Sequence, residues 1–221
     1  MIEAFIFDLD GTIVDSEPLW QVAELEVFAE EGIQLSMDDI APSKGLYTLD
    51  AVKLLYPKIP NPKRSINELA DALNKRALEL ILREGEIKAG VIETIEMLAS
   101  MGRPMGMASS TLRSMIEVIT NHFDIRKYFD VICSGQEEPY GKPHPGVYLT
   151  TTSQLGVNPL KCVAFEDSFN GMIAAKAAKL KLVAYLDLGN YSDTKYDFAD
   201  LKLESFYNFG PAQINYLESL V

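Results

Sequence analysis

Apolar residues follow two different patterns along this chain of 221 residues. The first run, Ala4–Phe7, is a continuous stretch rich in aromatic and branched residues, which is typical of a strand buried on both faces. Similar short runs recur later, and helical segments with apolar faces separate them. Strands are expected at 104–108, 131–133, 162–165 and 182–185, and helices at 91–101, after 109–111 through 122, at 147–155 and at 172–178. This alternation predicts βαβ units and a mainly parallel sheet.

The stretch between the first strand and this alternating region has a helical pattern only. Asp15–Pro18 is typical of a helix start, with a capping side chain before a proline in the first turn. The apolar face of this helix stops at Gly32, and further helical segments lie near 49–55 and 68–82, separated by a breaker-rich stretch. We therefore expect an α/β fold with a Rossmann-like parallel sheet core, formed by residues 1–14 and 86–221, and an inserted all-helical cap domain at 15–85.

Two carboxylates follow the first strand one residue apart. Positions i and i+2 of an extended chain point the same way, so Asp8 and Asp10 face one site while Leu9 faces the core. Gly11 allows a sharp turn, and the backbone N–H groups after it can form a nest for an anion. Two adjacent carboxylates are costly unless a cation or a shared proton compensates them. A strand end capped by a simple turn needs only one of these two residues.

Polar residues also follow the other predicted strands. Ser109 follows the second strand, Lys142 lies in the loop after the third, and Glu166 and Asp167 follow the fourth. In parallel sheets, ligands bind outside the carboxyl ends of the strands. Carboxylates together with a hydroxyl and an ammonium group suit magnesium and a phosphoryl group. Each residue alone also has a plain structural interpretation, as a helix cap or a solvated charge; Ser110 and Ser168 in particular are expected to be helix caps.

Composition narrows the choice of partners and location. The net charge of −12 and the pI of about 4.6 argue against a nucleic-acid or anionic-membrane surface. Cys133 and Cys162, the two cysteines, lie in apolar strand segments and are expected to be buried free thiols of a reducing compartment. With only two histidines, a histidine metal site is excluded. No apolar run reaches the length of a membrane span, so the cytoplasm is the expected location.

The strand-end residues resemble the four motifs of the haloacid dehalogenase-like phosphotransferases. The motifs are Asp8-Leu9-Asp10-Gly11-Thr12, Ser109, Lys142 and Glu166-Asp167, and the resemblance covers essentially the whole chain. Within the family, the stretches 15–20, 142–145 and 166–171 are similar to the group of β-phosphoglucomutase and the small sugar-phosphate phosphatases, in particular the hexitol phosphate and 2-deoxyglucose-6-phosphate phosphatases. The resemblance implies an enzyme acting on a small phosphorylated metabolite, and we expect a monomer.

The resemblance also implies a mechanism. Asp8 would attack phosphorus and form an aspartyl-phosphate, and Asp10 would protonate the leaving oxygen and then deprotonate water. Magnesium would be held by Asp8, the backbone carbonyl of Asp10 and Asp167, with Glu166 close by. The phosphoryl oxygens would be bound by Ser109, Lys142 and, beside them, Ser110.

One stretch of the helical block departs from the family pattern. The mutase has an arginine shortly after a glycine there, which engages the distal phosphate, whereas Ser43–Asp50 contains no arginine. Lys44 is either a substitute substrate ligand or a solvated loop lysine. This departure favours a phosphatase over the alternative, a mutase of the β-phosphoglucomutase type; a non-catalytic phosphate-binding module is the third possibility. Trp20 is expected to pack between cap and core, with a place in the sugar pocket as the alternative.

Overall fold

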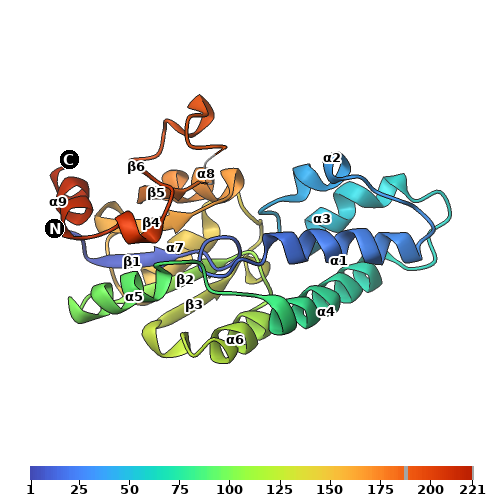
Figure 1. Ribbon diagram of the computed structural model, residues 1–221, viewed down its shortest axis with the longest axis horizontal. Coiled ribbons are helices and arrows are strands. Elements are labelled where there is room, and N and C mark those ends of the chain that lie inside the picture. The colour runs from blue at the N-terminus through green and yellow to red at the C-terminus, as the bar shows by residue number, and fades with distance from the viewer. Residues whose placement is uncertain (187–188, 221) are drawn as a thin grey trace.

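The computed structural model describes residues 1–186 and 189–220, and its centre is a parallel sheet (Figure 1). The strand order is β3-β2-β1-β4-β5-β6, and every neighbouring pair is parallel. The strands are β1 (Ala4–Phe7), β2 (Met105–Ser109), β3 (Val131–Ser134), β4 (Cys162–Glu166), β5 (Lys181–Tyr185) and β6 (Leu201–Leu203). The predicted α/β fold with a parallel sheet is therefore confirmed. From β1 the chain adds β2 and β3 on one side of the sheet and then β4, β5 and β6 on the other. Ligands bind at such a switch point of a parallel sheet.

Side chains alternate between the two faces of the sheet and build an apolar layer on each. Phe5 and Phe7 of β1 belong to one layer, where the Phe7 ring stacks on Phe165 at 4.3 Å, while Ala4 and Ile6 belong to the other. The first layer is covered by α5 (Val91–Ser100), α6 (Arg113–His122) and α9 (Pro211–Ser219), and the second by α7 (Gly146–Leu155) and α8 (Phe169–Ala177). Both faces of β1 are thus buried, as its continuous apolar run predicts.

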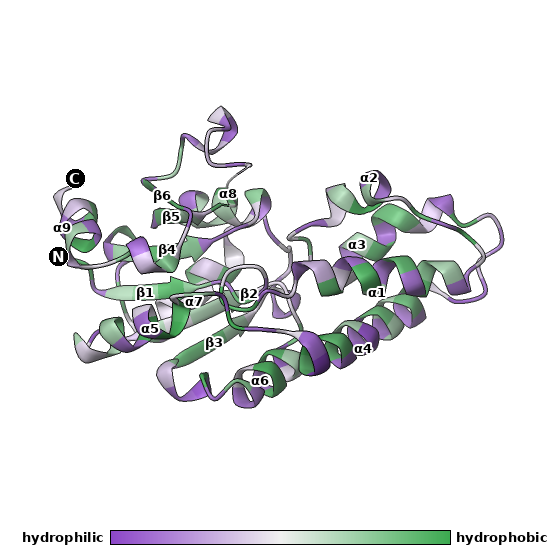
Figure 2. Cartoon of the chain, viewed as in Figure 1, coloured by the Kyte–Doolittle hydropathy of each residue, from purple (hydrophilic) through white to green (hydrophobic). Residues whose placement is uncertain are grey.

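Residues 17–84, here called the helical unit, extend from the sheet edge at which β1 ends (Figure 1). The unit consists of α1 (Glu17–Glu30), α2 (Met37–Ile40), α3 (Thr48–Leu55) and α4 (Ile66–Glu84). It has an apolar cluster of its own, and its helices carry green apolar stripes beside purple polar ones in Figure 2. This separate cluster supports the proposed division into 1–14 with 86–221 and 15–85, which otherwise stays a prediction.

Several details differ from the sequence-based expectations. Strand β6 was not predicted, because Leu201–Leu203 is a short strand of which only Leu203 is fully buried. Helix α1 begins at Glu17 as expected, but the Ser16 hydroxyl makes no capping hydrogen bond. Helix α8 begins at Phe169, three residues earlier than predicted, and Ser168 is its cap as expected.

The remaining sequence predictions concern cysteines and membranes. Cys133 and Cys162 are both buried and free, as predicted. Within 1–186 and 189–220, no helix has the length and apolar character needed to cross a bilayer.

Candidate active site

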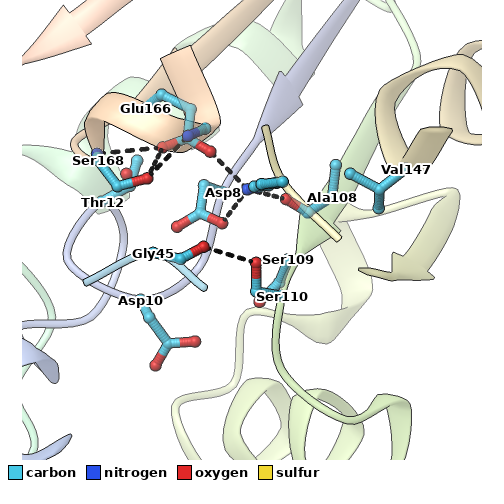
Figure 3. A network of polar contacts seen from close by, with 12 residues as sticks. Asp8, Asp10, Thr12, Gly45, Ala108, Ser109, Ser110, Val147, Glu166 and Ser168 are labelled. Carbon is cyan, nitrogen blue, oxygen red and sulfur yellow. Dashed lines mark hydrogen bonds and ion pairs between the residues drawn. The ribbon is translucent and has the colours of Figure 1, made fainter. Parts of the chain in front are cut away.

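The carboxyl ends of β1, β2 and β4 and the loop after β3 meet around one buried ion cluster (Figure 3). The Lys142 ammonium donates hydrogen bonds to Asp8 Oδ1 at 2.7 Å, to the Ala108 carbonyl at 3.0 Å, and to Glu166 Oε1. All three side chains that carry charge here are buried. The structure therefore brings together residues that lie up to 158 positions apart, from Asp8 to Glu166, as the strand-end argument predicted.

Burial and charge act against each other in this cluster. Burial raises the pKa of Asp8 well above its ordinary value, an effect that Lys142 opposes and the neighbouring Glu166 reinforces. Burial alone would lower the pKa of Lys142, but the Asp8 and Glu166 carboxylates outweigh it and raise that pKa above its ordinary value. Lys142 therefore stays an ammonium and holds Asp8 and Glu166 in place.

Three carboxylates form a group with the dimensions of a metal site. One oxygen from each of Asp8, Glu166 and Asp167 lies within 4.8 Å of the others. Oxygen ligands of this kind suit magnesium, and three carboxylates so close together are stabilised by positive charge, of which Lys142 and Lys44 supply a part. The Asp10 carboxylate is not part of this group, and Figure 3 shows it pointing away from Asp8. The predicted role of the Asp10 backbone carbonyl as a metal ligand stays a prediction.

The Asp10 carboxylate is instead held by three donors. The Ser16 hydroxyl and the Trp20 indole N–H donate to its Oδ1 at 2.7 and 2.9 Å, and the Thr111 hydroxyl donates to its Oδ2 at 2.7 Å. This explains why Ser16 does not cap α1. Trp20 packs between the two parts of the chain, as expected, and it also lines the cavity described below. The packing of Trp20 between cap and core is therefore confirmed, and its contact with a sugar stays a prediction.

Glu166 is completely buried and has the most hydrogen-bond partners of the cluster. Besides Lys142, it accepts from the Tyr148 hydroxyl at 2.7 Å, and from the backbone N–H and hydroxyl of Ser168 at 3.2 and 3.1 Å. Burial, followed by the Glu166 charge, raises the pKa of Tyr148 well above its ordinary value, so this phenol stays a donor. Gly171 leaves room for the carboxylate, because a Cβ at that position would overlap it.

Asp167 is held from the helical unit. Lys44 forms an ion pair with its Oδ2 at 3.0 Å, and the Thr12 hydroxyl donates to its Oδ1 at 3.3 Å. Burial raises the pKa of Asp167 although Lys44 opposes the rise. A Cβ on Gly11, whose φ is +80°, would overlap the Asp167 carboxylate, so glycine is required there for space as well as for the turn. Lys44 is thus not a merely solvated loop lysine; its predicted contact with substrate stays untested.

The two serines after β2 differ in their contacts. Ser109 is completely buried, and its hydroxyl oxygen accepts from the Thr111 N–H at 3.1 Å. Ser110 is not a helix cap, and that prediction was wrong: α6 begins at Arg113, and the Ser110 hydroxyl donates to the Gly45 carbonyl at 3.0 Å (Figure 3). Ser110 therefore joins the end of β2 to the helical unit, and its predicted contact with substrate stays a prediction.

A cavity of about 180 Å³ lies between these strand ends and the helical unit. Its wall on the sheet side includes Asp8, Asp10 and Lys142, and the opposite wall is formed by residues of the helical unit. This second wall includes residues for which the sequence offered no functional signal, among them Glu17, Gln21, Glu24, Ile40, Ser43, Thr48 and Leu73. The volume is below that of sites for drug-sized ligands, so the cavity suits a small metabolite.

Comparison with known proteins gives consistent matches. A family model described as haloacid dehalogenase-like hydrolase matches residues 5–185. The chain is 39% identical over 205 residues, 92% of each chain, to hexitol phosphatase B of Escherichia coli K12. Two crystal structures are similar over nearly their whole lengths. One is CbbY from Rhodobacter sphaeroides in complex with phosphate, with a TM-score of 0.88, 27% identity, and 97% of this chain and 100% of that chain covered. The other is β-phosphoglucomutase from Clostridium difficile, with a TM-score of 0.85, 25% identity, and 99% and 98% covered.

Proposed function

This chain belongs to the haloacid dehalogenase-like hydrolases, and we propose that it is a magnesium-dependent phosphatase that hydrolyses small sugar or polyol phosphates through an aspartyl-phosphate on Asp8. The observation that carries the proposal is the position of Asp8, which is held by Lys142 in a three-carboxylate group at the wall of a small cavity. The similarity to hexitol phosphatase B supports the same class of substrate.

Asp8 is the nucleophile in this proposal. Its free carboxylate oxygen attacks phosphorus, the bond from phosphorus to the sugar oxygen breaks, and Asp10 gives the leaving oxygen a proton. Asp10 then takes a proton from water, which attacks phosphorus and releases phosphate from Asp8. Ser16, Trp20 and Thr111 fix the Asp10 carboxylate at the cavity wall.

The remaining charged residues bind the phosphoryl group and the metal. Lys142 already contacts Asp8 and lines the cavity, so its ammonium can meet the incoming phosphoryl oxygens, with Ser109 beside it. Asp8, Asp167 and Glu166 are the residues of the three-carboxylate group that would hold magnesium. When bound, magnesium lowers the repulsion between an anionic nucleophile and an anionic phosphate. The three carboxylates carry three negative charges when ionised, and Lys142 and Lys44 supply two positive charges. The negative charge that remains supports a cation at this group.

The cavity favours a phosphatase over a mutase. A mutase must retain a bisphosphate, which requires a firm hold on a second phosphate. Among the residues in the described part of the chain, no arginine lines the cavity. Lys44, the lysine that could replace the mutase arginine, is paired with Asp167 at the strand ends. The monomeric state and the cytoplasmic location stay predictions.

Two assays on one preparation test this proposal. Phosphate release is measured across hexose 6-phosphates, hexitol phosphates and p-nitrophenyl phosphate, with magnesium and with EDTA. Conversion of β-glucose 1-phosphate to glucose 6-phosphate is measured in parallel. We expect magnesium-dependent phosphate release that exceeds isomerisation. If isomerisation is faster than release, the mutase is the correct assignment, and if neither reaction occurs, the chain is a binding module.

A further inference from the structure

One face of α1 forms a row along the cavity. Glu17, Trp20, Gln21 and Glu24 are spaced i, i+3, i+4 and i+7, and all four line the cavity. Glu17 interacts electrostatically with Asp10 and Asp167, which places it at the catalytic end of the row. Glu24 follows seven residues later, about 10 Å further along the helix axis. The row therefore runs from the catalytic end of the cavity, at Glu17, to its distal end, at Glu24.

The distal end contains a buried carboxylate with unused hydrogen-bonding capacity. Glu24 is 7% exposed, and it accepts a hydrogen bond from the Ser43 hydroxyl, which lies 2.8 Å from Oε1 and 3.1 Å from Oε2. The same hydroxyl lies 2.6 Å from the Ile40 carbonyl, so its one hydrogen is shared among three acceptor oxygens. In the described ranges, Glu24 forms no ion pair with a lysine or arginine. A carboxylate accepts up to about four hydrogen bonds.

Electrostatics at this end favour donors and disfavour anions. Glu17 adds a second carboxylate to the same helix face and interacts unfavourably with Glu24. Burial, the larger cause, and this repulsion raise the pKa of Glu24 to about 7, which shows that solvent stabilises its charge poorly. A hydroxyl group that donates a hydrogen bond to Glu24 would stabilise its negative charge, whereas a second phosphate beside it would add electrostatic repulsion.

We propose that Glu24 is the residue that selects the distal end of the substrate, by accepting hydrogen bonds from neutral hydroxyl groups and repelling a second phosphate. This inference rests on the proposed phosphatase function and deepens it: the substrate class becomes monophosphates with a free hydroxylated end. Ser43 positions the Glu24 carboxylate at the cavity wall.

The test measures the response of the wild-type protein and of Glu24→Gln to three compounds. Sorbitol 6-phosphate offers distal hydroxyls, p-nitrophenyl phosphate has none, and fructose 1,6-bisphosphate serves as an inhibitor with a second phosphate. The assays are run at about pH 8, where the Glu24 carboxyl is mostly ionised. Glutamine keeps the size of the side chain but accepts a weaker, neutral hydrogen bond. We expect kcat/KM for sorbitol 6-phosphate, relative to p-nitrophenyl phosphate, to fall about tenfold. The inhibition constant of the bisphosphate should fall about fivefold or more.

Two further variants make the result specific. Glu26→Gln is the matched control, because Glu26 lies on the same helix, is exposed, and pairs with Arg76. It should change neither the relative kcat/KM for sorbitol 6-phosphate nor the inhibition constant of the bisphosphate. Glu24→Asp retains the charge but shortens the side chain, so it should weaken sorbitol 6-phosphate hydrolysis while still excluding the bisphosphate. This variant also carries the test if Glu24→Gln does not fold.

The outcomes separate this inference from the proposed function. Suppose that the wild-type protein hydrolyses sorbitol 6-phosphate while Glu24→Gln changes neither the relative kcat/KM nor the inhibition constant of the bisphosphate. That result would refute the role of Glu24 and leave the proposed phosphatase function intact. Equal losses for sorbitol 6-phosphate and p-nitrophenyl phosphate would make Glu24 merely structural and also overturn the inference. If the wild-type protein releases no phosphate from any of the substrates, the proposed function itself fails.

Discussion

Replacing Glu24 by glutamine should remove a pH-dependent cost from the free energy of folding. In the folded protein, burial raises the pKa of Glu24 to about 7 from an ordinary value of 4.5. The folded state therefore binds the Glu24 proton more tightly than the unfolded state does. The contribution of this proton to stability is complete below pH 4.5 and is lost as the pH rises through about 7. At 1.36 kcal/mol per pH unit, the interval corresponds to about 3 kcal/mol.

This magnitude can be measured by urea unfolding of the wild-type protein and Glu24→Gln at about pH 5 and about pH 8. Trp20 is the single tryptophan and lines the same cavity, so its fluorescence reports on this region. Glutamine does not titrate, so the gain in stability of the variant over wild type should be larger at about pH 8 than at about pH 5 by about 2.5 kcal/mol, which is most of the full interval. Glu17, whose pKa burial also raises to about 7, is present in both proteins, so the part of its titration that does not involve Glu24 cancels in the comparison. The repulsion between Glu17 and Glu24 is already included in the raised pKa of Glu24. A constant stability difference at the two pH values would refute the argument that Glu24 is a poorly solvated carboxyl.

Three further substitutions test the contacts around the active site. Gly171→Ala should displace the Glu166 carboxylate, lowering the free energy of unfolding by about 1–3 kcal/mol and also kcat/KM; unchanged urea midpoints would show that the site tolerates a Cβ. Asp167→Ala should raise the magnesium concentration for half-maximal activity at least about tenfold, with calcium acting as an inhibitor because it prefers more ligands and looser geometry; full wild-type activity in EDTA would contradict this. Trp20→Phe keeps an aromatic ring but removes the indole N–H that donates to Asp10, so kcat should fall about tenfold; wild-type kcat would show that this hydrogen bond is dispensable.

The sequence was most informative where physical constraints were local. A strand buried on both faces must be continuously apolar, so β1 through β5 were visible as short apolar runs. Ligand sites in parallel sheets follow strand ends, so Asp8, Ser109, Glu166 and Asp167 could be selected without knowing their contacts. β6 lacked this signal because Leu201–Leu203 is short and lies at the sheet edge.

Contacts between distant segments could not be predicted in the same way. Tyr148 lies within an apolar stretch of α7 and looks like an ordinary core residue, yet its hydroxyl donates to Glu166. Ser110 looked like a helix cap because it precedes a helix. Its hydroxyl instead donates to the carbonyl of Gly45, a residue of the helical unit. Glu24 had no recognisable motif. Its i+7 spacing from Glu17 was a signal, but only the cavity shows that this helix face meets the strand ends.

The direct test of the central claim is phosphate release from a hexitol phosphate by Asp8→Asn beside the wild-type protein, at saturating magnesium. An amide at this position cannot form the acyl-phosphate bond, and it removes one anionic ligand from the three-carboxylate group. Far-UV circular dichroism confirms that each preparation is folded. The account predicts magnesium-dependent turnover by the wild-type protein and none by the variant. Turnover by folded Asp8→Asn at a rate near that of wild type would contradict the assignment of Asp8 as the nucleophile.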